Sequence, residues 1–480
     1  MTRRGFTTDL ISALPPFRSR STRTEVSAAG NKIDGHHISP ATSAMARVRK
    51  KAKIGRLELE VMEWVAIGIA FLGLVAIFCI FFIRRHVLEY HLEHTYGVSD
   101  PEFFGSALAL SAPIPLAGNK VELLQNGDES FPAMLAAIRG AKKTLNFEAY
   151  IVYSDEVGQA FRDALMERAR AGLEVRVLLD GLGSGWGLDN SDVRLMKNAG
   201  CKLAYYHPLL SWRIDRANRR SHRRVLVVDG KVGFTGGIGF ANQWSGHAQD
   251  PKHWHDVQAR VEGPLVTELQ HAFEEHWIKT FGETLSGADQ FPALGAAGSL
   301  RAQVIASHSF SMAPLPLTQA ISFAAAEKRI WITNAYCTPS DDQVELLVKA
   351  VERGVDVRFI LPGRHNDQPL TKSAGRAAYG RLLEGGVKIF EYQPTMIHTK
   401  AMVIDGMFSL FGSSNFDPRS SEINEELDLA IYDREFGSRM EAMFESDLKR
   451  SRPYTIEQFR NRSLWERITE ELMLPFRTQL

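Results

Sequence analysis

The sequence predicts an α/β protein in which one domain is built twice, preceded by one membrane-spanning helix. Strand-like and helix-like segments alternate over most of the chain, the same order of segments occurs twice, and an apolar run precedes both copies. The chain has 480 residues, of which 44% are hydrophobic. It is therefore long enough for each copy to bury a core.

The apolar run comprises residues 64–83, WVAIGIAFLGLVAIFCIFFI, and carries no charged residue. As a helix it would be about 30 Å long, which matches the hydrocarbon core of a bilayer. A signal peptide is the alternative, but its apolar part is shorter than this run. We therefore expect residues 47–90 to form a basic flank and a membrane anchor. Residues 1–46, rich in Ser, Thr, Arg, Ala and Gly, are expected to be disordered.

The first copy is expected to span residues 118–283. Residues 144–153, TLNFEAYIVY, predict a strand, residues 155–172 predict an amphipathic helix, and residues 173–181 predict a buried strand. The small residues of GADQFPALGAAGS indicate a linker at residues 284–300.

The second copy is expected to span residues 301–450 and repeats this order. Residues 329–338, RIWITNAYCT, predict a strand, residues 341–354 a helix, and residues 355–363 a strand. Residues 451–480 are expected to form a helical tail. An α/β unit that occurs twice explains this order better than chance does.

Each copy places a histidine and a basic residue two positions apart at the start of an apolar strand. The first copy has HRRVLVVDG from His222, and the second has HTKAMVIDG from His398. Side chains two apart on a strand share a face, so Arg224 accompanies His222 and Lys400 accompanies His398. Burying such groups is costly unless they are paired. We expect all four to line one pocket between the copies.

Each motif ends in Asp-Gly, at Asp229 and Asp405. Asp-Gly is a hairpin-turn signal, so these aspartates are either turn residues or members of the catalytic set.

Two imidazoles and two fixed cations suit the cleavage of a phosphodiester. The cations hold the phosphoryl oxygens, one histidine attacks phosphorus, and the other protonates the leaving alkoxide. The hydroxyl of water or of an alcohol then opens the phosphohistidine. Histidine titrates near neutrality, so one imidazole can start neutral and the other protonated. This chemistry requires no metal and no other cofactor.

The second motif, HTKAMVIDGMFSLFGSSN, resembles the HxKxxxxD(x6)GSxN signature of the phospholipase D superfamily. Its continuation, NFDPRSSEINEELDLAI, is similar to the form found in bacterial cardiolipin synthases, and the resemblance covers roughly residues 120 to 470. It implies two mixed β-sheets flanked by helices, with a pseudo-two-fold active site between the copies. It also implies a catalytic set of six residues: His222, His398, Arg224, Lys400, Asp229 and Asp405.

Within this set the resemblance implies His222 as the nucleophile and His398 as the general acid. It implies Asn415 and Ser413 as substrate-binding residues. Family members also carry a carboxylate beyond each motif that orients a histidine, and two residues match these places: Asp256 and Glu426.

A metal site formed by His253, His255 and Asp256 is the alternative interpretation of the segment HWHD.

The first motif departs from the family pattern at two positions. Arg224 replaces lysine, but arginine keeps its charge and can hold a phosphate with two hydrogen bonds. Gly239 stands where the asparagine is expected, and Asn242 is the candidate replacement. A first copy without catalytic function is the alternative.

Three substrate classes are consistent with these residues: a phosphatidyl donor with an alcohol acceptor, a phospholipid hydrolysed by water, and a nucleic acid. The formal charge of +1 and the anchor weigh against nucleic acid. The segment LLSWRIDRANRR, residues 209–220, suits an anionic lipid surface or is simply an exposed basic loop. We expect phosphatidylglycerol in the bilayer as the substrate and cardiolipin as the product; the sequence leaves the oligomeric state open.

Basic residues are more numerous before the predicted anchor than after it: Arg47, Arg49, Lys50, Lys51, Lys53 and Arg56 precede it, and Arg84 and Arg85 follow. The resemblance implies a protein of the bacterial inner membrane, and the positive-inside rule predicts a single-pass orientation with the catalytic part on the outer, periplasmic face. Three scattered cysteines, Cys79, Cys201 and Cys337, form neither a disulfide framework nor a zinc motif.

Overall fold

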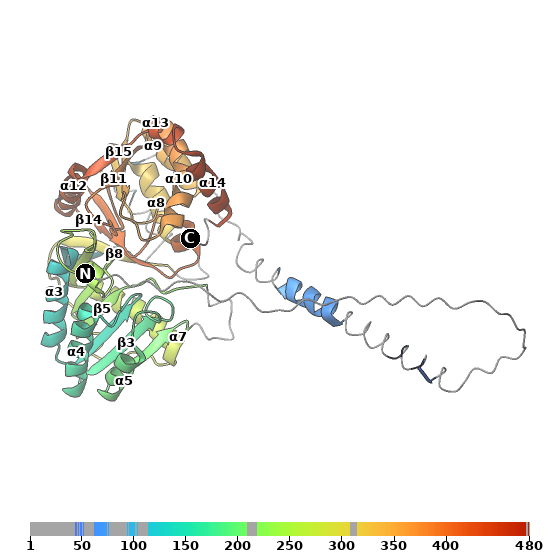
Figure 1. Cartoon of the computed structure of the whole chain (residues 1–480). Helices are drawn as coiled ribbons and strands as arrows, with labels where there is room; N and C mark the ends of the chain where they lie inside the picture. The colour runs from blue at the N-terminus through green and yellow to red at the C-terminus, as the bar shows by residue number, and fades with distance from the viewer. Residues whose placement is uncertain are drawn as a thin grey trace, which may run out of the picture. The chain divides into compact units, whose positions relative to one another are not determined.

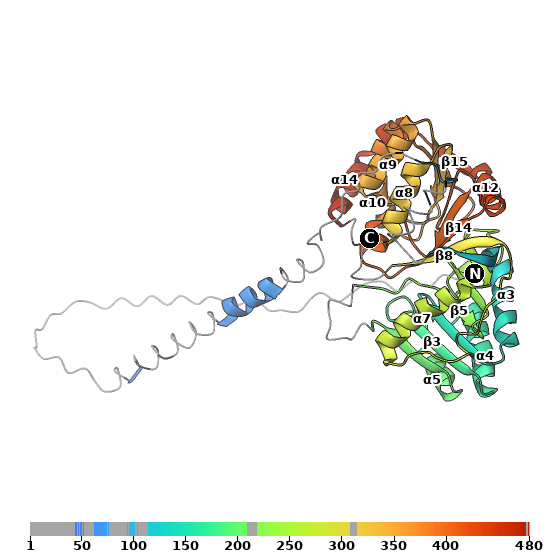
Figure 2. The ribbon, with the colours of Figure 1, turned by 180° about the vertical axis from the view of Figure 1, so that it is seen from behind.

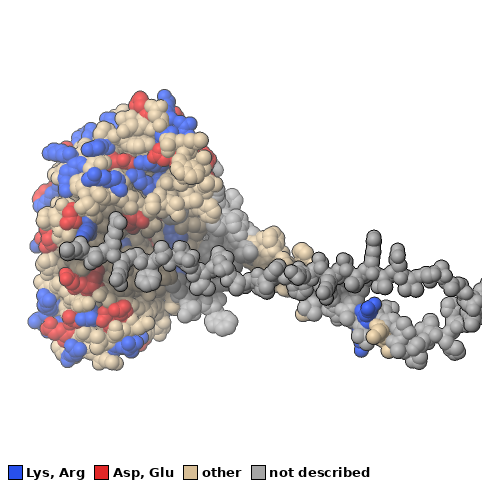
Figure 3. All heavy atoms as spheres, in the orientation of Figure 1, with Lys and Arg blue, Asp and Glu red and all other residues tan. Residues whose placement is uncertain are grey.

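The computed structural model describes residues 44–45, 47, 49, 51, 62–73, 75, 94, 96–100, 103, 114–208, 218–307, 314–476 and 479. The chain divides into two compact units, Met1–Val75 and Ala76–Leu480, and the second unit contains both predicted copies. Acidic and basic side chains are interspersed over the visible face of the globular part (Figure 3), in keeping with the formal charge of +1.

Three sequence-based predictions fall largely outside these residues. The predicted anchor at 64–83 is described at residues 64–73, which are helical, and at residue 75; the predicted disordered segment 1–46 is described at residues 44 and 45. The basic insert is described from residue 218 onward. Within the described residues, no helix combines the length and apolar character that crossing a membrane requires.

The first copy contains strands and helices in the predicted alternation. In chain order they are β1 (Leu116–Gln125), α3 (Asn126–Gly140), β2 (Thr144–Ala149), α4 (Glu156–Arg170), β3 (Glu174–Asp180), α5 (Asn190–Asn198), β4 (Lys202–Tyr206), β5 (Val225–Val228), β6 (Val232–Gly236), η1 (Asn242–Trp244), β7 (Val257–Glu262) and α7 (Leu265–Phe281).

The second copy repeats the sequence of elements and ends in a short tail. Its elements are β8 (Leu300–Ala306), α8 (Pro314–Ala325), β9 (Arg329–Thr333), α9 (Asp341–Glu352), β10 (Asp356–Pro362), α10 (Pro369–Glu384), β11 (Lys388–Tyr392), β12 (Ala401–Ile404), β13 (Phe408–Gly412), α11 (Pro418–Glu422), β14 (Leu427–Tyr432) and α12 (Arg434–Lys449). The tail contains β15 (Ser451–Tyr454), α13 (Ile456–Arg460), α14 (Leu464–Met473) and η2 (Leu474–Phe476).

The two copies have the same strand order. In the described part of the chain the order is β15-β11-β10-β9-β12-β13-β14-β8-β1-β7-β6-β5-β2-β3-β4, so the second half mirrors the first, with β15 added at one edge. In each copy three strands pair in parallel and the rest are antiparallel. Figure 1 shows the two copies as an upper and a lower half that meet at β8.

The prediction of two separate mixed sheets needs a correction at this meeting point. β1 pairs with β8, through Leu116 with Ala302 and Asn119 with Leu300, and so joins the halves into a 15-stranded sheet within the described residues. The physical reason is that each copy would otherwise leave the backbone groups of an edge strand unpaired.

Helices cover both faces of the sheet. β5 shows why, because all four of its residues are buried: Leu226 and Val228 face the core beneath α3, α4 and α5, while Val225 and Val227 face α7. On the α7 side the core is shared, and it includes side chains of α7 and of α12. Seen from behind, α8, α9 and α10 lie together over the second copy (Figure 2).

Candidate active site

Each motif histidine makes a backbone hydrogen bond to a residue of the other copy. The N–H of His222 donates to the carbonyl of Glu425 at 2.9 Å, and the N–H of His398 donates to the carbonyl of His255 at 2.7 Å. Both contacts belong to short parallel bridges, Ser221 with Glu425 and Ile397 with His255. The two motifs are therefore fixed at the boundary between the copies by equivalent contacts.

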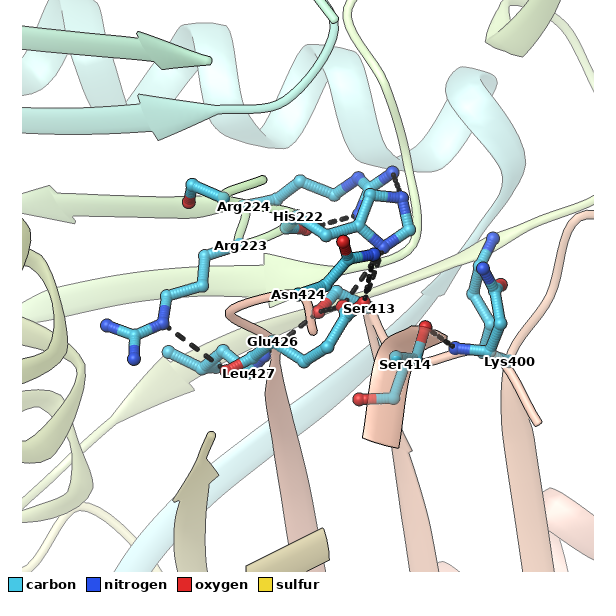
Figure 4. A network of polar contacts seen from close by, with 12 residues as sticks. His222, Arg223, Arg224, Lys400, Ser413, Ser414, Asn424, Glu426 and Leu427 are labelled. Carbon is cyan, nitrogen blue, oxygen red and sulfur yellow. Dashed lines mark hydrogen bonds and ion pairs between the residues drawn. The ribbon is translucent and has the colours of Figure 1, made fainter. Parts of the chain in front are cut away.

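His222 is held by Glu426, which comes from the opposite copy (Figure 4). Its Nδ1 lies 3.0 and 3.1 Å from the two carboxylate oxygens. Ser413 donates its hydroxyl to Glu426 Oε2 at 2.5 Å, and Asn424 donates to Oε1 at 3.3 Å. Arg224 donates to the carbonyl of His222 at 2.6 Å, and its Nη2 lies 3.1 Å from Nε2.

His398 is held in the same way by a carboxylate from the first copy. Its Nδ1 lies 2.6 Å from Asp256 Oδ2. Lys400 donates to the carbonyl of His398 at 2.6 Å, and its Nζ lies 2.9 Å from the imidazole Nε2. Each copy thus supplies one histidine with its cation, together with the carboxylate that orients the histidine of the other copy.

Asp256 and Glu426 each accept a further hydrogen bond besides the one to a histidine, and the donor differs between them. Asp256 accepts from the indole N–H of Trp244 at 3.1 Å, where Glu426 accepts from Ser413. The first motif has Gly237 and Gly239 where the second has Ser413 and Asn415. A Cβ at Gly239 would lie 2.8 Å from the Trp244 ring, and one at Gly237 would lie 2.3 Å from Asp256 Oδ1. The Trp244 ring therefore occupies the space that a side chain at position 239 would take.

Asn242 does not take the place of that asparagine. Its side chain is exposed, and its Oδ1 accepts from the backbone N–H of Val157 at 3.1 Å. The chain has turned away from the site by the time it reaches η1.

Asp229 and Asp405 are turn residues, which corrects their assignment to the catalytic set. Both have positive φ, 52° and 54°, and each is followed by a glycine of positive φ. Asp229 accepts from Lys142 N at 2.8 Å, Lys143 N at 2.7 Å and Thr144 N at 3.0 Å, and Asp405 makes three equivalent bonds to the residues at and before the start of β9. Because β5 and β12 run between each histidine and its aspartate, the carboxylates lie at the opposite strand ends.

The three residues of the alternative metal site have separate partners. His253 Nδ1 lies 2.8 Å from Asp250, and His255 lies 2.7 Å from Asn126 and 3.1 Å from Asp447. Asp256 holds His398. Among the described residues, no group of three or more His, Cys, Asp or Glu side chains is arranged to hold a metal ion.

Asn415 leaves a polar atom available at the site. The side chain is 8% exposed, and its backbone N–H donates to Ser420 Oγ at 3.1 Å. Within the described part of the chain, its Oδ1 has no hydrogen-bond partner. A buried acceptor left without a partner costs about 1–3 kcal/mol, so this atom is suited to receive a donor from a ligand.

The two histidines differ in the pKa of the carboxyl group that holds each of them. Burial and the charge of Arg224 hold the pKa of His222 well below its ordinary value, and burial and Lys400 lower the pKa of His398 to about 4. Burial raises the pKa of Glu426 to about 7. Burial also acts to raise the pKa of Asp256, but the nearby charges of His398 and Lys400 leave it below the ordinary range. Burial lowers the pKa of Lys400 to about 7.

Two tyrosines complete the walls and were missed in the sequence. Tyr150 contacts His222 edge to face at a ring distance of 4.7 Å, and Tyr336 contacts His398 at 6.0 Å. The hydroxyl of Tyr336 donates to Asp367 at 2.8 Å. A sequence signal existed, because each tyrosine follows an alanine within the corresponding predicted strand, in NFEAY and ITNAY.

Known proteins share this arrangement of two copies. A family profile described as "Cardiolipin synthase, PLD-like domain" matches residues 134–277 and 318–448. The chain is 33% identical to "Cardiolipin synthase 1" of Bacillus anthracis over 73% of its length and 71% of the relative's. It is 34% identical to "Cardiolipin synthase A" of Pseudomonas syringae pv. syringae, over 72% of this chain and 71% of that protein.

The fold is also found in a solved structure, the phosphatidylserine synthase of Haemophilus influenzae. The TM-score is 0.56 at 15% identity, over 75% of this chain and 95% of that chain. A likeness at this identity concerns the fold alone. The sequence relatives go further and confirm the resemblance predicted from the motifs: the chain belongs to the cardiolipin synthase family of phospholipase D-like proteins.

Proposed function

We propose that the protein is a membrane-anchored phosphatidyltransferase that makes cardiolipin from two phosphatidylglycerol molecules and releases glycerol. The observation that carries the proposal is the crossed arrangement of His222 with Glu426 and His398 with Asp256. Two oriented imidazoles flanked by Arg224 and Lys400 provide a nucleophile, a proton donor and two cations for one phosphodiester.

In the first step His222 attacks phosphorus of the first phosphatidylglycerol. A P–N bond forms, the P–O bond to glycerol breaks, and His398 gives its proton to the leaving alkoxide. In the second step the neutral His398 takes the proton from a hydroxyl of the second phosphatidylglycerol. That oxygen attacks phosphorus, the P–N bond breaks, and cardiolipin forms while His222 is regenerated.

The two carboxylates support this division of roles. A proton donor must become an imidazolium, which requires an ionised partner, and the pKa of Asp256 stays low because of His398 and Lys400. His222 needs to stay neutral to attack, and its pKa is lowered by burial and by Arg224. A bound phosphodiester anion would raise the pKa of Lys400 and of His398 by its opposite charge.

Substrate contacts follow from the remaining groups. Arg224 and Lys400 would hold the phosphoryl oxygens. Asn415 Oδ1, which has no hydrogen-bond partner among the residues that the structure describes, can accept a hydroxyl proton of the glycerol headgroup. Ser413 is engaged with Glu426 and acts through it. We assign no metal and no other cofactor to the reaction.

The proposal also includes the location of the protein in the cell. The apolar run at residues 64–83 would anchor the chain in the inner membrane of a bacterium, and the excess of basic residues before the run favours a catalytic part on the outer face.

A product assay tests the proposal. The full chain, purified in detergent and mixed with phosphatidylglycerol, should form cardiolipin and glycerol in equal amounts. Phosphatidic acid as the main product would instead identify a hydrolase of the phospholipase D type. Stopping the reaction in alkali should preserve the phosphorylated protein, and acid should then remove the phosphoryl group, because a phosphohistidine is stable in alkali and labile in acid. The double variant His222→Ala/His398→Ala is the matched control for both measurements.

A further inference from the structure

Helix α14 has its polar and apolar sides reversed relative to an ordinary surface helix. Its most buried residue is Glu470, 2% exposed, and Glu466, Thr469 and Met473 are half-buried. Its exposed residues include four large apolar side chains: Leu464 at 73%, Trp465 at 75%, Ile468 at 37% and Leu472 at 61%. A surface helix of a soluble domain normally buries its apolar stripe.

Specific polar contacts hold the helix in this orientation. A capping box fixes its start, with Ser463 and Glu466 bonded to each other's backbone N–H groups. Arg376 of α10 donates to Glu466 at 2.9 Å, and Arg462 donates to Glu470 at 2.7 Å. The exposure of the apolar side is therefore a consequence of the fold and not of a loosely attached helix.

The exposed apolar residues form one continuous stripe. At about 100° per residue, positions 464, 465, 468 and 472 fall within a sector of roughly 100°. Leu474 and Phe476 of η2, which follows α14, are also exposed, at 36% and 41%. Figure 3 shows a largely uncharged area at the edge of the upper half, where Figure 1 places α14. Two charged residues border the stripe, Arg467 and Glu471, and both are exposed.

The chain beyond this stripe reaches the active-site region. Gln479 accepts from Asn218 Nδ2 at 2.8 Å, and its carbonyl accepts from Arg419 at 3.0 Å. Asn218 lies four residues before His222, and the charge of Arg419 contributes to the lowered pKa of His222. The segment that follows α14 therefore connects it to residues near the first catalytic histidine.

We propose that α14 forms an interfacial membrane-binding element that lies in the headgroup region of a bilayer containing anionic phospholipid. Leu464, Trp465, Ile468 and Leu472 would enter the acyl boundary, and Arg467 would contact lipid phosphates. Trp is a side chain favoured at this depth, because one end of its ring system is apolar and the other is polar. This inference rests on the proposed function, since it places the site where a bilayer lipid can enter.

Site-directed fluorescence tests the placement without any turnover. In a Cys79→Ala background, Ile468→Cys carries an environment-sensitive label; Cys201 and Cys337 are buried. Full-length protein is placed in nanodiscs containing phosphatidylglycerol with brominated acyl chains. We expect strong quenching at position 468. The matched control is Leu195→Cys on α5, 45% exposed in the first copy, which should not be quenched. Equal fluorescence in brominated and ordinary lipid at position 468 would overturn the proposal.

A kinetic comparison distinguishes the effect of membrane binding by α14 from the effect of the catalytic residues. The triple variant Leu464→Ser/Trp465→Ser/Leu472→Ser should lower the ratio of the rate on vesicles to the rate on dispersed short-chain phosphatidylglycerol by about tenfold. Leu195→Ser should leave this ratio unchanged. If light scattering instead shows that the triple variant converts a dimer to a monomer, the stripe binds a second copy and the lipid proposal is wrong. Quenching without cardiolipin formation would reject the proposed function alone.

Discussion

The indole N–H of Trp244 donates to Asp256 Oδ2 at 3.1 Å, where the equivalent carboxylate in the other half of the site accepts from a serine. Asp256 in turn holds His398 at 2.6 Å. The tryptophan thus fixes the carboxylate from one side and packs against the imidazole from another, at a ring distance of 5.2 Å.

Trp244→Phe should lower kcat by about tenfold and leave KM nearly unchanged, because Trp244 orients Asp256 and does not contact substrate. Steady-state kinetics on phosphatidylglycerol measures this. Trp254→Phe is the control, since Trp254 lies near His398 at 5.4 Å and a phenyl ring keeps that contact. A KM effect as large as the kcat effect would show that Trp244 binds substrate directly.

His222→Ala and His398→Ala should each lower turnover by more than about 10³-fold while the protein stays folded, because the two imidazoles act in one reaction. Product formation and circular dichroism, measured on the same preparations, check both parts. The turnover of the double variant should be no lower than that of the less active single variant. Substantial turnover in either single variant would contradict a site built from both copies.

His276 should stabilise the boundary between the copies through its charge. Its ring lies 2.6 Å from Glu148 and 2.6 Å from Glu425, the residue before the orienting Glu426. Burial and Arg223 act to lower the pKa of His276, but the two carboxylates leave it above the ordinary value. His276→Gln should therefore cost about 3–5 kcal/mol at pH 6.

The sign of the pH effect follows from the raised pKa of His276. The stabilisation is complete below about pH 6.5, the pKa of an unfolded histidine, and it is lost as pH rises through the folded value. Thermal unfolding of wild type and His276→Gln at pH 6 and pH 9 should show a Tm difference that shrinks at pH 9. A constant difference would mean that His276 acts by packing alone, for instance through its stacking on Tyr206.

Asp428→Asn should stabilise the protein increasingly as pH rises. Burial raises the pKa of Asp428 to about 7, and the carboxyl accepts from the N–H of Ser414 at 3.1 Å. Between about pH 4 and pH 7 the unfolded carboxyl ionises while the folded one resists, so wild type loses stability over this window. The Tm of the variant minus that of wild type should grow from pH 4 to pH 7 and then level off.

Chelators should leave turnover unchanged, because His253, His255 and Asp256 are bonded to separate partners. The measurement is cardiolipin formation with and without EDTA. Loss of activity that one divalent ion restores would revive the metal interpretation of these residues.

The duplication and both histidine motifs could be predicted from the sequence, because periodicity places His222 and Arg224 on one strand face without knowledge of packing. The crossing of Glu426 to His222 could not, since it depends on contacts between residues about 200 positions apart. Asp229 was assigned to the catalytic set from the family resemblance, although its Asp-Gly pair also indicated a turn, which is what the structure shows. Trp244 was missed because it belongs to a short 3-10 segment with no pattern that links it to Asp256.

The difference between Trp244 and Ser413 has an evolutionary consequence. Two identical half-length chains that met on a two-fold axis would carry the same donor beside both carboxylates, so any change would alter both half-sites at once. Covalent fusion of the halves removes that restriction, because each gene segment then mutates independently. One half-site can be adjusted for expelling the leaving group while the other is adjusted for holding the phosphoryl group. Unlike donors at Asp256 and Glu426 are the kind of difference that such independent change permits.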